Sequence, residues 1–103
     1  MSLKQQMQTD LKVFFNLEEF AELKNIDGTL RPVVVDNDRL QYRSKVEYDG
    51  VLVGDVLFYV GGTEFPRQPM PGDRMRYEGV ACTVFDVRPD GGVLEVILRK
   101  NTG

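Results

Sequence analysis

The sequence predicts a mainly β fold, a small antiparallel β-barrel or sandwich with one N-terminal α-helix. From about residue 20 onward the chain consists of short apolar runs, rich in β-branched and aromatic residues and separated by glycine turns. Only the first fifteen residues repeat apolar side chains at helical spacing. A chain of 103 residues has room for one core, so we expect a single domain, 1–103, with the helix at about 3–15 and the barrel at about 20–100.

The N-terminal segment is predicted to be helical because its apolar residues form one stripe. Ser2 is a suitable N-cap and Asn16 a plausible end. We expect the stripe to pack against the protein's own sheet, with packing against a neighbouring subunit as the alternative. The stripe consists of Leu3, Met7, Leu11, Phe14 and Phe15.

The first hairpin is predicted around Asp27-Gly28, a dipeptide that fits a two-residue type I′ turn. It places strands at roughly 20–26 and 29–36. Pro32 has no N–H for a sheet hydrogen bond, so its strand is expected to lie at an edge or to be bulged there.

The segment 36–50, DNDRLQYRSKVEYDG, has seven charged residues and no apolar period. We therefore expect a long, solvated, mobile loop that a partner surface would order. Asp36 and Asp38 begin like a calcium loop, but Leu40 and Gln41 stand where an oxygen ligand and a glycine are needed. No metal site is expected.

The run VLVGDVLFYVGG, 51–62, is the strongest predicted strand, with a bend at Gly54-Asp55. It is apolar on both faces, which indicates a closed or covered sheet with a helix packed outside. One face carries Val56, Phe58 and Val60, and the other carries Leu57 and Tyr59.

The last third of the chain predicts two hairpins. A turn at Glu78-Gly79 would pair Met75 with Cys82 and place the thiol on the apolar face. A second turn at 89–92 leads into the final strand. Its inward face would carry Leu94, Val96 and Leu98.

Composition disfavours an enzyme. The chain has no histidine, and Cys82 has no histidine partner, so neither acid–base nor nucleophilic catalysis is indicated. We expect no cofactor and no metal. The N-terminus lacks the apolar core of a signal peptide, and no apolar run reaches the roughly 20 residues of a membrane span.

One alternative is an OB-like or SH3-like module that binds nucleic acid or peptide. Arg67, Arg74 and Arg76 with Tyr77 could form a basic aromatic strip. The net charge of -3 opposes a general affinity for nucleic acid.

Several segments resemble a known family. Pro71-Gly72-Asp73, Gly79 and VFDVRPDGGVLEVIL at 84–98 are similar to the corresponding strands of lambda-type phage head–tail attachment proteins. EFAELKNIDG, VVVDNDRL and Arg43-Ser44-Lys45 look more like the PBSX-like prophage branch. The chain thus resembles the head–tail joining (head-completion or stopper) proteins of long-tailed phages.

The resemblance implies a structural virion protein without catalytic residues. Such a protein, made in the bacterial cytoplasm, forms a ring, expected to be a hexamer, between the portal–adaptor assembly and the tail terminator. DNA passes through its channel without specific binding. Because one core uses most of the apolar residues, we expect a monomer that forms the ring only on its adaptor.

Two segments are the expected assembly contacts, the loop 36–50 and the 61–72 region. Reversing the charges of Arg39, Arg43 and Lys45 is expected to block assembly without changing the melting temperature. The candidate residues are Asp36, Asp38, Arg39, Arg43, Lys45 and Glu47 in the loop, and Arg67 and Met70 in the second region.

Overall fold

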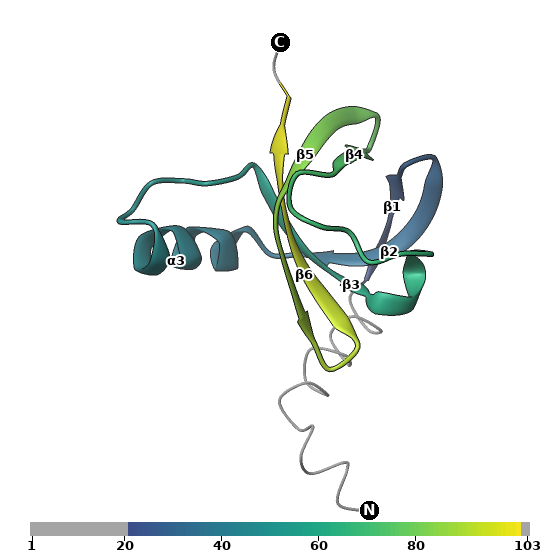
Figure 1. Ribbon diagram of the computed structural model, residues 1–103, viewed down its shortest axis with the longest axis horizontal. Helices are drawn as coiled ribbons and strands as arrows, with labels where there is room; N and C mark the ends of the chain where they lie inside the picture. Colours follow the sequence, from purple (N-terminus) through teal and green to yellow (C-terminus); the bar gives the residue numbers. More distant parts are fainter. Residues whose placement is uncertain (1–20, 102–103) are drawn as a thin grey trace, which may run out of the picture.

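The computed structural model describes residues 21–101, which form a closed antiparallel barrel with one flanking α-helix (Figure 1). Around the barrel the strands run in the order β1-β2-β3-β6-β5-β4, and β4 returns to β1 where Tyr77 pairs with Ile26. The mainly β prediction is confirmed, whereas the predicted helix at 3–15 lies outside the described residues. The strands are β1 (Glu22–Ile26), β2 (Thr29–Val35), β3 (Val56–Gly61), β4 (Arg74–Tyr77), β5 (Val80–Asp90) and β6 (Val93–Lys100).

Three two-residue turns connect the hairpins, and both residues of each turn have positive φ. This is the geometry of a type I′ turn, whose twist matches that of the paired strands. β2 is not the predicted edge strand and has no bulge at Pro32, because it pairs with β1 through Pro32 and with β3 from Val33 to Val35. Pro32 itself lies outside the stretch that pairs with β3, where its missing N–H costs no sheet hydrogen bond. The turns are Asp27-Gly28, Glu78-Gly79 and Gly91-Gly92.

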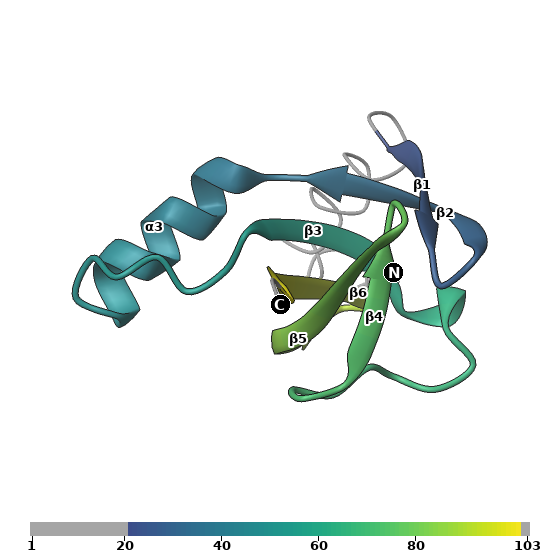
Figure 2. The same ribbon diagram turned by 90° about the horizontal axis from the view of Figure 1, so that it is seen from above.

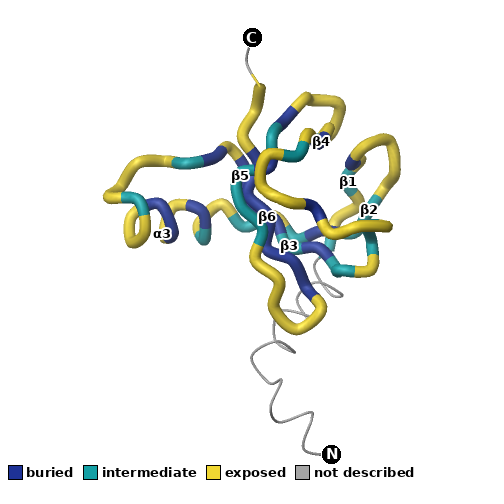
Figure 3. The backbone as a smooth tube through the Cα atoms, viewed as in Figure 1, coloured by how far each residue is buried: buried dark blue, intermediate teal, exposed yellow. Residues whose placement is uncertain are grey.

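The barrel interior is the main core, and its faces are those that strand alternation predicts. Met75 pairs with Cys82, and the thiol side chain is buried. Figure 3 shows burial concentrated along β3 and β6, the two central strands. The core comprises Ile26, Val33, Val56, Phe58, Val60, Met75, Cys82, Val84, Leu94, Val96 and Leu98.

A second, smaller cluster lies on the outer face of the barrel. Leu57 of β3 and Ile97 of β6 point outward and pack with Leu40. Leu40 belongs to helix α3 (Asn37–Glu47), which lies beside the barrel after β2 (Figure 2). The prediction of a mobile loop at 36–50 is therefore wrong. A helix covers the outer apolar face, and within residues 21–101 that helix is α3.

A β-bulge in β5 shapes the surface that α3 contacts. Val84 pairs with Leu98 and Asp86 pairs with Ile97, so Phe85 is an extra residue in the strand. Because Leu98 faces the core and Ile97 faces outward, both Phe85 and Asp86 emerge on the outer face. Without the bulge, Asp86 would share the inward face of Val84.

Gly54, at the predicted bend before β3, has no space for a side chain. A Cβ there would clash with Ile97 Cγ2 and lie 3.0 Å from the carbonyl oxygen of Leu98. We predict that Gly54→Ala lowers the free energy of unfolding by about 1–3 kcal/mol, measured by urea denaturation. Gly61→Ala is the control, since its nearest neighbour would be Glu64 Cγ at 3.8 Å. Equal stability of the two variants would contradict the close packing at Gly54.

Cys82 supplies a second test of the barrel. Its side chain is 2% exposed, and burial raises the pKa of the thiol. A thiol reagent should therefore react with the native protein only after denaturant is added. Rapid labelling without denaturant would show that β5 presents its other face to the core.

Candidate assembly interface

α3 begins and ends with local signals in its own sequence. The Asp36 carboxylate accepts a hydrogen bond of 3.0 Å from the backbone N–H of Arg39, as an N-cap does. Asp38 lies in the first turn and Lys45 in the last, where each favours the helix dipole. The helix ends at Glu47, and the N–H of the C-cap residue Tyr48 donates to the carbonyl of Ser44 at 3.1 Å.

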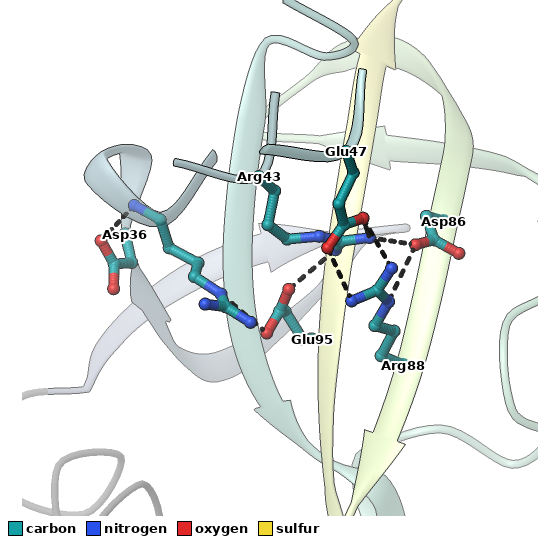
Figure 4. A network of polar contacts seen from close by, with 7 residues as sticks. Asp36, Arg43, Glu47, Asp86, Arg88 and Glu95 are labelled. Carbon is teal, nitrogen blue, oxygen red and sulfur yellow. Dashed lines mark hydrogen bonds and ion pairs between the residues drawn. The ribbon is translucent and has the colours of Figure 1, made fainter. Parts of the chain in front are cut away.

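The centre of α3 carries a fully buried arginine. The Arg43 side chain is 0% exposed, and its guanidinium contacts three carboxylates (Figure 4). Two of these lie on barrel strands, Glu95 at 2.7 Å and Asp86 at 2.5 Å. The third is Glu47, one turn along the helix at 3.4 Å. Arg43 thus joins α3 to β5 and β6.

Two further arginines complete an ionic network of three arginines and three acids. Arg88 of β5 donates to both carboxylate oxygens of Glu47, at 2.7 and 3.1 Å, and lies 3.4 Å from Asp86. Arg39 lies 3.5 Å from Glu95. Three positive and three negative side chains balance their charges across the junction of helix and barrel, and Figure 4 labels all of them except Arg39. The six members are Arg39, Arg43, Glu47, Asp86, Arg88 and Glu95.

The network shifts the ionisation of its members. Burial opposes the charge on Arg43, but the bonds to Asp86 and Glu95 outweigh it and raise the pKa of the guanidinium. The hydrogen bonds from Arg88, together with Arg43, lower the pKa of Glu47. Both groups are therefore held in their charged forms, and the network is an ionic anchor at neutral pH.

The exposed side of α3 carries two large apolar side chains among polar ones. Tyr42 and Val46, one turn apart, are 57% and 61% exposed. Val51 and Leu52 in the following segment are 64% and 59% exposed. We call residues 37–55, which comprise α3 and the segment before β3, the arm.

A groove of about 590 Å³ lies along the arm, between α3 and the segment at 50–52. Ser44 also lines it, and its hydroxyl is buried with no hydrogen-bond partner among the described residues. The groove therefore combines two exposed large side chains, Tyr42 and Leu52, with a mainly polar lining. The other residues lining it are Asp38, Gln41, Tyr42, Lys45, Gly50 and Leu52.

The structure places the predicted interface residues in three different environments. Asp36 caps α3, and Arg39, Arg43 and Glu47 belong to the ionic network, so these four hold the arm on the barrel rather than forming a free loop. Asp38 and Lys45 are exposed and line the groove. Arg67 and Met70 are exposed in a separate segment, 65–73.

Sequence reasoning missed Asp86, Arg88 and Glu95, because they lie 41 to 52 residues from their partners on α3. One local signal was available. Glu95 interrupts the otherwise apolar run VLEVIL, and a charge inside a buried strand requires a partner. The sequence did not identify that partner as Arg43.

Comparisons with known proteins show no family for this chain. No family model matches the chain, and no curated protein does. One solved structure, the "ATP-binding sugar transporter-like protein" from Salmonella typhimurium, is 23% identical with a TM-score of 0.49, over 96% of this chain and 93% of that chain. At that similarity it carries no inference about function.

The described residues, 21–101, contain neither a candidate membrane-spanning helix nor a candidate metal site. None of their helices has both the length and the apolar character needed to cross a bilayer. No group of three or more His, Cys, Asp or Glu side chains in this range is placed to hold a metal ion.

The first prediction at this site is that Arg43→Met strongly destabilises the protein. It would leave three carboxylates close together without their shared cation, at a cost of about 3 kcal/mol. Lys45→Met on the exposed face of the same helix should change stability by less than about 0.5 kcal/mol. Urea unfolding of both variants measures the difference. The expectation that charge reversal at Arg39, Arg43 and Lys45 leaves the melting temperature unchanged assumed exposed side chains, and for Arg43 that assumption is wrong. Similar stabilities for the two variants would contradict the anchor.

The second prediction concerns the loss of folding stability at acid pH. Because folding lowers the pKa of Glu47, its contribution to stability is present above the ordinary glutamate pKa of about 4.3 and is lost as pH falls below it. Glu47→Gln should therefore be less stable than the wild type at neutral pH, and the difference should shrink between about pH 5 and pH 3. Urea unfolding across this range measures it. A constant difference would show that Glu47 does not act through its charge.

Proposed function

We propose that this protein is a structural head–tail joining protein of a long-tailed phage or prophage, acting as a non-enzymatic subunit of a connector ring. The resemblance of segments between residues 19 and 98 to this family supports the proposal. The observation that carries it is the arm, which is anchored to the barrel by buried charges while it exposes four large apolar side chains.

An anchored apolar surface is suited to assembly. Exposed apolar residues gathered in one place mark sites of protein contact. Because the network holds α3 in place, binding a partner would order few additional backbone groups, which lowers the entropic cost of association. The arm therefore differs from a loop that must fold during assembly.

The partner that best fits the arm is the next copy of the same chain. The outer face of the β1–β2 hairpin exposes Leu23 and Leu30, at 63% and 61%, and the strand register places both on the same face as Pro32. Figures 1 and 2 show this hairpin and α3 on opposite sides of the barrel. A contact between two different surfaces of identical subunits is heterologous, and it closes into a ring when the rotation allows.

In such a ring, expected to have six copies, other surfaces would face the portal–adaptor assembly and the tail terminator. Arg67 and Met70 lie exposed in the 65–73 segment, outside the arm and outside the β1–β2 hairpin. They are the proposed contacts with these partners. The channel would pass DNA, and the site of action would be the connector of the virion.

The test is an assembly assay with the double variant Tyr42→Ser/Val46→Ser. Both side chains are exposed, so stability should change by less than about 1 kcal/mol, while joining of heads to tails should fail. Val80→Ser, at a residue 41% exposed on the barrel, is the control and should assemble normally. Normal particle yield with the double variant would remove the arm from the interface. Purified heads and tails that join equally well without the protein would contradict the function itself.

A further inference from the structure

A second concave surface, away from the arm, gathers arginines from three segments. Arg31 of β2, Arg67 of the 65–73 segment and Arg74 of β4 line one pocket of about 450 Å³. Its walls are otherwise mostly apolar, and two aspartates complete it. The remaining lining residues are Asp27, Phe65, Pro66, Pro69, Asp73 and Met75.

The two aspartates are engaged by backbone groups. Asp27 accepts a hydrogen bond of 2.8 Å from the N–H of Arg76, and Asp73 accepts one of 3.0 Å from the N–H of Met70. By contrast, Arg31, Arg67 and Arg74 form no ion pair with any residue between 21 and 101. The three arginines outnumber the two aspartates, so this surface is net positive in a chain of net charge -3, and no ion pair within residues 21–101 neutralises its arginines.

Among the described residues, Arg31 is the one of the three arginines that makes a cation–π contact. Its guanidinium carbon lies 4.6 Å from the centroid of the Phe65 ring, a cation–π contact that fixes the plane of the group. Its Nε is buried and has no hydrogen-bond partner among the described residues. This N–H is therefore a donor that the described residues leave available to a bound acceptor.

The concave surface continues along β4. An adjoining pocket of about 500 Å³ shares Asp27, Arg74 and Met75 with the first and adds Arg76. One guanidinium nitrogen of Arg76 donates to the carbonyl of Gly79 at 3.1 Å. Tyr77, the aromatic residue expected in a basic strip, instead stacks on Phe58 in the core at 5.6 Å. Phe65 supplies the aromatic ring of this surface.

We propose that this surface is a phosphate-binding site, and that it takes successive phosphates of an extended chain such as a nucleic-acid backbone. Guanidinium groups bind phosphate oxygens through paired N–H donors, and three that lack ion pairs converge here. The second pocket along β4 gives room for the next phosphate. The inference does not depend on the ring, because the pocket lies within one subunit; Arg67 is the residue that it shares with the partner contacts proposed above.

The test uses two phosphate probes, a fluorescent single-stranded dT oligonucleotide and inorganic pyrophosphate, measured at low salt. The variant Arg67→Gln/Arg74→Gln removes two charges whose side chains make no bonds to the described residues, so it should fold normally. Lys45→Gln/Arg99→Gln removes two exposed charges elsewhere and is the matched control. Circular dichroism and the melting temperature confirm that both variants are folded.

The oligonucleotide should bind the wild type and the control, and the Arg67/Arg74 variant should bind at least about tenfold more weakly. The slope of log K against log salt should become less steep by about 1.4 in that variant, because each phosphate contact on a single strand contributes about 0.7. If pyrophosphate binds and the oligonucleotide does not, the surface is still a phosphate-binding site, but its ligand is a small molecule and not an extended chain. Equal losses in the two variants would overturn the site. The phosphate site would also be overturned if a poly-glutamate peptide bound under the same conditions while neither phosphate probe did.

Discussion

A buried arginine on α3 determines where the arm lies. Arg43 loses its hydration on folding, and such a charge is tolerated only where acceptors surround it. Those acceptors, Asp86 and Glu95, project from two different strands of the barrel. Because hydrogen bonds between a guanidinium and carboxylates are directional, they fix the position of α3 more narrowly than the apolar contact of Leu40 could.

The barrel provides the matching surface through one irregularity. The bulge at Phe85 brings two consecutive residues of β5 to the outer face, one apolar and one charged. The Phe85 ring meets Tyr48 edge-on at 5.6 Å, just beyond the end of α3, while Asp86 meets Arg43. A single extra residue in a strand therefore contributes both to the apolar contact and to the ionic contact that hold the arm, and the arm can expose its other face.

The sequence predicted the barrel well because strand alternation and turns are local. Asp27-Gly28 and Glu78-Gly79 set the register of their hairpins, and the two faces of β3 follow from alternation alone. It failed at α3, where the buried stripe is Leu40, Arg43 and Ser44 instead of an apolar repeat. An apolar pattern cannot reveal a helix whose buried face is largely polar. The cap at Asp36 and the Arg43–Glu47 spacing indicated a helix locally, but the acids that stabilise it lie far along the chain.

The central claim, that residues 37–47 are a helix docked by buried charges, is tested most directly by native-state amide hydrogen exchange of the isolated protein. If the network holds α3, amides from Leu40 to Glu47 should open with a free energy of about 3 kcal/mol or more. Added salt should change that value little, because buried ion pairs are weakly screened. Exchange of these amides at the rate of an unstructured peptide, with the barrel strands still protected, would show that the segment is a mobile loop and would contradict the account.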